Sequence, residues 1–473
     1  MFDEVLERFI QNSPVAVMVR VLLENLLNAD KMDRWFDTVR QSQYTKEILF
    51  SSIVGLMLQV VCKIRPTVHS AYPHSGIPAS VVAVYDKLKG LETTTSQGLV
   101  RQIASESEAL IKNMAGENPP LLPGYRVKFL DGNCLEATEH RLEVLRGTRA
   151  GALPGKSLVV FDPELGIALD VFPCEDGHAQ ERSLLSAVVE TIQAQDLWIA
   201  DRNFCDLEFL FTIHQKSAFF VVRQHGSTPY KPLTPLKFVG KSETGDVFEQ
   251  RVEITAPKGR TLQVRRIVVE LKTPTRNDDK YLILLTNLPQ ETVEALTVAE
   301  LYRARWGIET AFQKLESHLN SEINTLGYPK AALFGFCLAL VAFNIYAIVM
   351  AALRATHRDQ AINETVSEYY IAQEIATTTG GMLIAVPQIE WTLFTQASSA
   401  ELGSILLNMA SYVDLKKYKK HPRGPKKSPI ERNQFQGHPH VSTGKLLKAA
   451  AVKAAAAKIA AKAAAAKIAA KAA

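Results

Sequence analysis

The stretch YRVKFLD, residues 125–131, decides the fold of this chain. Its apolar and polar residues alternate as in a half-buried β-strand that ends at Asp131. Two further apolar stretches, LVVFD at 158–162 and IALDVF at 167–172, predict two more strands. The PELG sequence between them is typical of a tight turn, in which we expect Asp162 to take part. The sequence therefore predicts a β-meander.

A helix and a fourth strand follow the meander. Residues 178–196 have helical spacing of apolar residues, and LWIAD at 197–201 is a short apolar run that ends at Asp201. Residues 206–290 contain further strand-like runs between polar turns, which we interpret as a β-rich insertion. With the insertion set aside, the order predicts an α/β fold with an RNase H-like core, in which helices flank a mixed sheet.

The next helix is predicted from a capping-box pattern, Thr297 to Glu300, and continues through residues 301–319. At about 100° per residue, one stripe of this helix carries polar side chains. These are Tyr302, Arg305, Glu309 and Glu316. Apolar residues occupy the adjoining arc, so one face should pack into the core. Trp306 and Phe312 flank the stripe, where aromatic residues more often belong to the core than to a base-stacking site.

Three acids of these elements suit phosphodiester cleavage. Asp131 and Asp201 end strands that are neighbours in an RNase H-like sheet, so their carboxylates should emerge at one edge, and Glu309 supplies a third. Two divalent cations about 4 Å apart can activate the attacking oxygen, stabilise the leaving oxygen and neutralise the transition state. Mg²⁺ prefers such oxygen ligands. Arg305 and Tyr302 beside Glu309 suit phosphate groups.

Each acid also has a structural explanation. Asp131 precedes a glycine and suits a turn. Asp201 could cap a helix. Glu309 could form a surface ion pair with Arg305, worth only about 0.3 to 0.5 kcal/mol. The three together, in this order and context, favour catalysis.

Composition indicates a multidomain globular protein. The chain has 473 residues, 47% of them hydrophobic and 22% charged, and single cores stop growing at roughly 250 to 300 residues. Its five cysteines are scattered without a CxxC pair, which argues against a zinc site or a disulfide framework and suits a reducing cytoplasm. The first residues, MFDEVLERFI, carry acids where a secretory signal would carry lysines, so we expect no export.

Positive charge is concentrated near the end of the sequence. The net charge is +5, but residues 401–473 hold 15 Lys or Arg against three acids. A basic run at 416–427 could be a solvated linker, yet its density of charge favours phosphate binding without sequence selectivity. Its first lysines are candidate DNA contacts: Lys416, Lys417, Lys419 and Lys420.

One apolar segment has the length of a membrane helix. Residues 331–353 are nearly uncharged, but they stand alone, and a helix that is apolar all round also suits the centre of a large core. We expect a buried helix and no membrane.

At this point the sequence resembles the IS4-type DDE transposases. Three blocks carry the resemblance: FLDGN around Asp131, LWIADRNF around Asp201, and YRARWGIET, which has the family's spacing of Tyr, Arg and Glu. The stretches PGKSLVVFDPELG and DGHAQERSLL also read like family members, so the resemblance covers roughly residues 120–350. One position departs, because Glu316 stands where the family has a lysine, which replaces an expected phosphate contact with a like charge.

The resemblance implies a cytoplasmic, nucleoid-associated enzyme that acts on double-stranded DNA. A homodimer would hold two inverted-repeat ends, cut them, and transfer the 3′-hydroxyl to target DNA, with a hairpin intermediate at the excised end. Asp131, Asp201 and Glu309 would bind Mg²⁺ or Mn²⁺, as two ions, and Tyr302 with Arg305 would hold phosphates. No further cofactor is expected.

Five regions are expected along the chain. They are a helical DNA-binding region at 1–118, the first part of the RNase H-like core at 119–205, the β-rich insertion at 206–295, the second part of the core at 296–414, and a basic Lys/Ala-rich tail at 415–473. Two other functions stay open beside a weaker third one, a membrane protein, which rests only on residues 331–353. One is a metal-dependent nuclease that does not join strands, and the other is an inactive transposase relic that only binds DNA.

Overall fold

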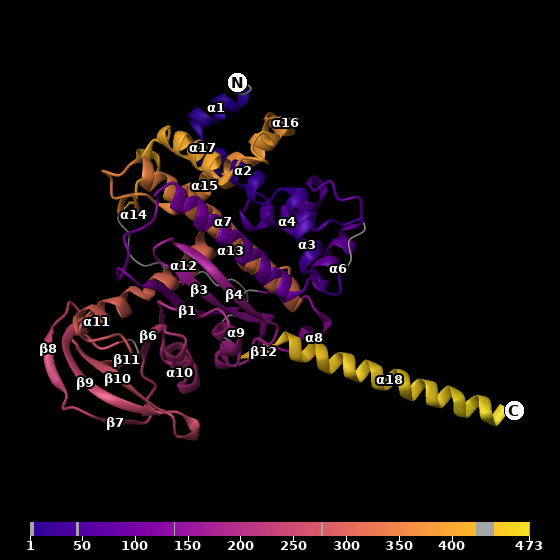
Figure 1. Ribbon diagram of the computed structural model, residues 1–473. Coiled ribbons are helices and arrows are strands. Elements are labelled where there is room, and N and C mark those ends of the chain that lie inside the picture. Colours follow the sequence, from indigo (N-terminus) through magenta and orange to yellow (C-terminus); the bar gives the residue numbers. More distant parts are fainter. Residues whose placement is uncertain (1–3, 44–46, 137, 276–277, 422–438, 473) are drawn as a thin grey trace.

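The computed structural model describes residues 4–43, 47–136, 138–275, 278–421 and 439–472. A ten-stranded mixed β-sheet lies at its centre, and helices pack against both of its faces (Figure 1). The protein is therefore a mixed α/β structure, as the sequence predicts.

Five strands form the first half of the sheet, in the order β4-β3-β1-β5-β6. They are β1 (Arg126–Leu135), β3 (Gly155–Asp162), β4 (Ile167–Cys174), β5 (Asp196–Ala200) and β6 (Phe219–Arg223). Strand β1 pairs antiparallel with β3 and parallel with β5, and β6 continues parallel to β5. The predicted meander is present, and the strand that precedes Asp201 lies beside the strand that carries Asp131.

The second half of the sheet is antiparallel. Its strands are β7 (Tyr230–Pro232), β8 (Lys237–Lys241), β9 (Gly245–Thr255), β10 (Thr261–Leu271) and β11 (Tyr281–Thr286), with the short turn η4 (Pro257–Gly259) between β9 and β10. Strand β11 pairs with β6, and β10, β9 and β7 follow in that order, while β8 pairs with β9. The strands expected between 206 and 290 are therefore present, and they extend the central sheet.

Two hydrophobic clusters lie on the two faces of the sheet. Successive side chains of a strand point to opposite faces, and in β1 Phe129 belongs to the larger cluster and Leu130 to the smaller one. Helices α9 (Leu185–Val189) and α10 (Leu207–Gln215) cover the smaller cluster. The larger cluster lies under the helices of the N-terminal and C-terminal parts of the chain.

The N-terminal part is helical, as expected. Its elements are α1 (Glu4–Asn12), α2 (Pro14–Leu26), α3 (Ala29–Val39), α4 (Phe50–Val61), α5 (Val68–Ala71), η1 (Tyr72–His74), α6 (Val81–Gly90) and α7 (Thr93–Asn113). Helix α7 packs against α13 (Pro329–Thr356) and against β4. At that contact Arg101 donates two hydrogen bonds of 2.8 Å to the carboxylate of Asp170. The N-terminal helices thus share one core with the sheet.

Helix α13 lies at the centre of the larger cluster. It begins at Pro329, a favourable first residue because proline lacks an N–H. Every side chain from Ala331 to Tyr346 is buried. Among the described residues it is the one helix long and apolar enough to cross a membrane, and 89% of its most apolar window is buried in the protein. The fully buried Asn344 bonds both the N–H and the C=O of Ala168 in β4, at 2.8 and 2.9 Å.

The helix expected from Thr297 onward is two helices. They are α11 (Ala295–Ala304) and α12 (Trp306–His318), and the hydrogen bonds on both sides of Arg305 are of the tighter i to i−3 kind. The expected capping box is wrong, because α11 begins earlier, with Glu294 as its N-cap and no side-chain cap.

Two other bounds differ from expectation. Strand β1 does not end at Asp131 but continues to Leu135, because residues 131–135 stay paired with β3. The helix expected over 178–196 is reduced to η2 (Glu181–Leu184) followed by α9, since β5 already begins at its last residue. Apolar spacing alone did not reveal these limits, because strand pairing imposes them.

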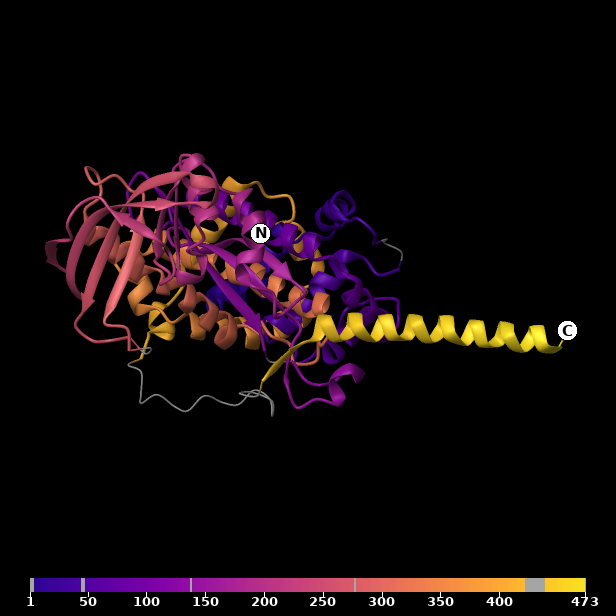
Figure 2. The same ribbon diagram turned by 90° about the horizontal axis from the view of Figure 1, so that it is seen from below.

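The C-terminal part adds a helical layer and a projecting helix. Its elements are α14 (Ile362–Thr365), α15 (Glu368–Ala385), α16 (Gln388–Thr392), α17 (Ser399–Ser411), η5 (Leu415–Tyr418), β12 (His440–Ser442) and α18 (Thr443–Ala472). Strand β12 pairs in parallel with β2 (Gly151–Leu153), and α18 begins beside α8 (Glu143–Arg146) and extends away from the rest of the molecule (Figures 1 and 2). Residues 422–427 of the basic run lie outside the described residues.

Candidate active site

Asp131 and Asp201 lie side by side at the end of the β1–β5 pairing. The last paired residues of these parallel strands are Leu130 and Ala200, so each aspartate is the next residue along its own strand. Asp201 then caps the turn η3 (Arg202–Phe204) by accepting a 2.7 Å hydrogen bond from the backbone N–H of Asn203. The sequence-predicted pair is therefore brought together, although Asp131 lies within β1.

Arg305 joins Asp131 to Glu309. Its Nη1 lies 2.8 Å from Oδ2 of Asp131, and its Nη2 lies 2.6 Å from Oε1 of Glu309. The side chain of Arg305 is only 8% exposed, whereas that of Glu309 is 49% exposed. The tight turn at Arg305 thus brings α12 to the edge of the sheet that carries the two aspartates.

Asp201 and Glu309 lie close enough to Asp131 to influence its carboxylate. Burial raises the pKa of Asp131 to about 6, and the charges of Asp201 and Glu309 act in the same direction. The Arg305 guanidinium and the backbone N–H of Gly132 oppose this rise. The structure therefore places the buried cation Arg305 between Asp131 and Glu309, with Asp201 beside Asp131.

Tyr302 and Arg305 are both buried at this site. Burial raises the pKa of Tyr302 to about 12, so its hydroxyl is neutral near pH 7. Burial disfavours the charge of Arg305, but Tyr302, Asp131 and Glu309 outweigh that effect and raise the pKa of Arg305. The Arg305 guanidinium also lies over the Tyr302 ring, 5.7 Å from its centroid. Their contacts in this structure are to protein groups.

The donor chemistry of the acids fits a hard divalent cation, since carboxylate oxygens are the ligands such ions prefer. The arrangement differs from a finished metal site, however, because Arg305 lies between Asp131 and Glu309. Within the described part of the chain, no three His, Cys, Asp or Glu side chains are grouped so as to hold a metal ion. Metal ligation by all three acids would therefore require Arg305 to give up at least one of its ion pairs.

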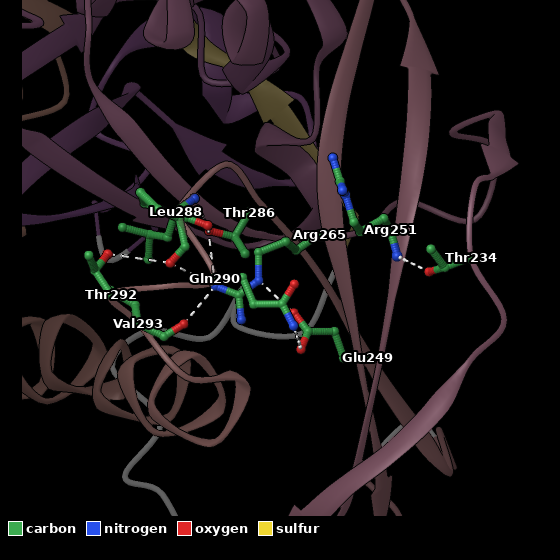
Figure 3. A network of polar contacts seen from close by, with 10 residues as sticks. Thr234, Glu249, Arg251, Arg265, Thr286, Leu288, Gln290, Thr292 and Val293 are labelled. Carbon is green, nitrogen blue, oxygen red and sulfur yellow. Dashed lines mark hydrogen bonds and ion pairs between the residues drawn. The ribbon is translucent and has the colours of Figure 1, made fainter.

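A buried network anchors the segment that leads into α11. Arg265 of β10 pairs with Glu249 of β9 at 2.5 Å and donates a 2.7 Å hydrogen bond to the carbonyl of Val293 (Figure 3). It also donates to the carbonyl of Leu288, at 3.2 Å. These contacts tie the antiparallel half of the sheet to the start of α11, the helix that ends just before Arg305.

Glu316 of the helical stripe and the residues that flank the stripe differ in their exposure and contacts. Glu316 is exposed, and Lys314 forms an ion pair of 2.6 Å with Glu368 of α15. Trp306 is 64% exposed, so the core explanation for it is wrong, whereas Phe312 packs partly buried against the larger cluster.

The candidate DNA contacts of the basic run are exposed lysines: Lys416, Lys417, Lys419 and Lys420. The ammonium of Lys417 donates to the carbonyl of Asn12, and that of Lys420 to the carbonyl of Asn363. Lys420 and Lys314 line the same cavity of about 790 Å³ behind α12. The end of the basic run thus lies near the helix that carries Glu309.

Sequence reasoning missed two residues next to the aspartates. Glu181 and Arg182 of η2 both bond Asn203, and the Glu181 carboxylate lies against Gly132. Their block, DGHAQERSLL, carried part of the family resemblance, which was the available signal.

The candidate site falls within a recognised domain. Residues 122–345 match the family model described as "Transposase DDE domain", and this range contains Asp131, Asp201 and Glu309. Domains of this class generally cleave and transfer nucleic acid with divalent metal ions, and DNA is their partner.

A curated relative agrees with the domain match. The chain is similar to the "Putative transposase y4zB" of Sinorhizobium fredii, with 26% identity over 214 residues. The similar region covers 42% of this chain and 57% of the relative. The site and the two comparisons together support a DDE transposase.

Proposed function

We propose that the chain is a transposase that binds inverted-repeat DNA ends, cleaves them by metal-dependent hydrolysis, and transfers the 3′-hydroxyl to target DNA. One observation carries the proposal. Asp131 and Asp201 lie side by side where the parallel pairing of β1 with β5 ends, and Arg305 ties Glu309 to Asp131 inside the matched transposase domain.

The finer classification is an RNase H-like core of the IS4 type. The strand order β4-β3-β1-β5-β6, with β3 antiparallel to its neighbours, supports the RNase H-like core. The spacing of Tyr302, Arg305 and Glu309 supports the IS4 type. The expected range of the insertion, 206–295, also contains α10 and β6, and β6 pairs in parallel with β5. On this reading the insertion is limited to the antiparallel strands β7 to β11.

Mg²⁺ or Mn²⁺, as two ions, would be held by Asp131, Asp201 and Glu309, and would activate the attacking oxygen and stabilise the leaving one. Glu309 is half exposed, so it can turn toward an arriving cation once Arg305 releases it. A released Arg305 would be free to donate its N–H groups to a DNA phosphate, for which its planar fork is suited.

The DNA would be held by charge outside the acids. Tyr302 and Arg305 would contact phosphates near the cut, and the lysines at 416–420 would add contacts that do not depend on sequence. The helical region before residue 119 would recognise the ends, and a homodimer in the cytoplasm would hold two of them. Exposed lysines and the absence of acids in α18 support a role of the tail in phosphate binding.

The decisive experiment compares Asp131→Asn, Asp201→Asn and Glu309→Gln with the wild type. Each change keeps the side-chain volume but removes a carboxylate charge, so we expect weaker Mn²⁺ binding and a loss of nicking of about 10²- to 10³-fold or more. Binding of end DNA in EDTA should stay unchanged. Mn²⁺ affinity, nicking and end binding are measured side by side, and the exposed Glu300→Gln of α11 serves as the control.

If one of the three variants nicks end DNA at the wild-type rate, that residue is not a ligand. Wild-type rates in all three would reject the proposed active site. A target plasmid in the same reaction separates the alternatives, because nicking without joined products would indicate a nuclease, and end binding without nicking would indicate an inactive relic.

A further inference from the structure

We propose that Glu181 and Arg182 of η2 are positioning residues that hold the turn carrying Asp201 beside Asp131. The inference deepens the proposed function and rests on it, because the two aspartates matter as a pair only if they share a ligand. It assigns a role to η2, a segment that belongs neither to the strands nor to the three acids of the candidate site.

A series of hydrogen bonds connects η2 to Asp201. Arg182 Nε donates a 2.7 Å hydrogen bond to the backbone carbonyl of Asn203, and Asn203 Nδ2 lies 3.4 Å from Oε2 of Glu181. The backbone N–H of Asn203 in turn donates to Oδ1 of Asp201 at 2.7 Å. Both residues of η2 therefore contact the residue that fixes the Asp201 carboxylate.

The same Glu181 also contacts the other aspartate's strand. A Cβ atom added at Gly132 would lie 2.2 Å from Oε1 and 2.7 Å from Cδ of Glu181, so the carboxylate occupies the space that a side chain would need. The backbone of Gly132 cannot easily move away from Glu181, because Gly132 is paired with Leu158 in the β1–β3 ladder. Its N–H donates to Oδ1 of Asp131 at 2.9 Å. Glu181 thus lies between the segments that carry the two aspartates.

Positioning is needed here for a physical reason. The backbone pairing of β1 with β5 ends at Leu130 and Ala200, so this pairing does not extend to the turn that Asp201 caps. Two like charges at adjacent strand ends repel each other. Outer groups that orient metal-binding carboxylates typically change metal affinity by about 10- to 100-fold when they are mutated.

The first test needs no metal. Hydrogen–deuterium exchange of a peptide covering residues 201–206 is measured in EDTA for the wild type, Glu181→Ala and Gly132→Ala, with Ser183→Ala as an exposed control in the same turn. We expect faster exchange of this peptide in the first two variants, wild-type exchange in the control, and wild-type exchange in peptides from α7. Unchanged exchange in Glu181→Ala would overturn the positioning role.

The second test separates positioning from ligation. Glu181→Ala and Gly132→Ala should weaken Mn²⁺ binding by about 10-fold or more, without changing end-DNA binding in EDTA. Glu181→Gln should restore most of the affinity, because its amide oxygen still accepts from Asn203. If Glu181→Gln loses as much affinity as Asp201→Asn, Glu181 is itself a ligand and the positioning role is wrong.

The experiments distinguish failure of the proposed function from failure of the positioning role. A wild-type protein that binds no Mn²⁺ would count against the transposase site, whereas the exchange rates measured in EDTA would still decide whether η2 holds the turn.

Discussion

At the scale of single residues, Arg305 is the cation that offsets the negative charges of the candidate site. It is a buried cation with two carboxylate partners, one of which is half exposed. A buried charge needs such partners, because removing one of them leaves the other uncompensated. Arg305 thus lets Asp131 and Glu309 stay close together. On the proposed function, one of these ion pairs would have to open before the acids could share a metal ion.

Asp162 gives a prediction about stability and pH. It accepts hydrogen bonds from the N–H groups of Glu164 and Leu165, as expected for the turn, while burial raises its pKa to about 6. Its unfolded value is about 3.9, so the folded chain binds the proton more tightly. The stabilisation that the protonated Asp162 carboxyl gives the folded chain is present below about pH 4, and it is lost as the pH rises to about 6.

Asp162→Asn keeps the acceptor oxygen and cannot ionise. Relative to the wild type it should gain about 2 to 3 kcal/mol between about pH 4 and pH 6, and the gain should stay constant above that range. Unfolding midpoints in urea measured across this range check the expectation. A variant that follows the wild type at every pH would show that Asp162 does not titrate in the fold.

At the scale of elements, one buried ion pair joins β10 to β9, and its arginine, Arg265, also donates hydrogen bonds to the segment before α11. Arg265→Leu would leave Glu249 buried without its partner, which typically costs about 3 to 5 kcal/mol. We therefore expect a lower unfolding temperature, measured by circular dichroism. Arg251→Leu on β9, an exposed arginine in the same view (Figure 3), should change it little.

The double variant Arg265→Leu with Glu249→Leu sharpens this test. Replacing both partners by apolar groups removes the uncompensated charge, so much of the lost stability should return. If the double variant is as unstable as Arg265→Leu, the backbone hydrogen bonds of Arg265 are what stabilise the contact.

The projecting helix α18 gives a prediction about DNA. Residues 415–421 do not form a free tail, because they include η5, in which Tyr418 is buried. The test therefore deletes residues 451–473, which takes away five lysines and no acid. Each phosphate contact contributes about 0.9 to the slope of log affinity against log salt, so the slope should flatten equally on random and end-containing DNA.

A variant with the same five lysines changed to glutamine keeps the helix and should flatten the slope as much as the deletion does. An unchanged slope in both would reject a role of α18 in phosphate binding.

At the scale of the whole molecule, α13 is the central helix against which the main parts of the chain pack. The N-terminal helices, the sheet and the C-terminal helices all contribute to the cluster around it. We expect the full chain in the detergent-free supernatant after cell lysis. A chain that begins at residue 119 should instead aggregate, because removing α7 exposes apolar side chains of α13. Recovery of the full chain only from membranes with detergent would contradict this expectation.

The sequence by itself determined the local features of this protein. A period of two residues predicted β1, apolar runs predicted β3, β4 and β5, and the spacing of Tyr302, Arg305 and Glu309 carried the resemblance to transposases. Such features are readable because they depend on which neighbours along the chain share a face. The length of the apolar segment 331–353 could not by itself distinguish a membrane span from a core helix.

Only the tertiary structure decided how these elements meet. It continued β1 beyond Asp131, joined β11 to β6, divided the predicted helix at Arg305, and placed Arg305 between Asp131 and Glu309. It also brought Glu181 against Gly132. Each of these outcomes depends on pairing or packing between residues far apart in the sequence. The local spacing of apolar residues does not indicate which distant strand or charge will be the partner.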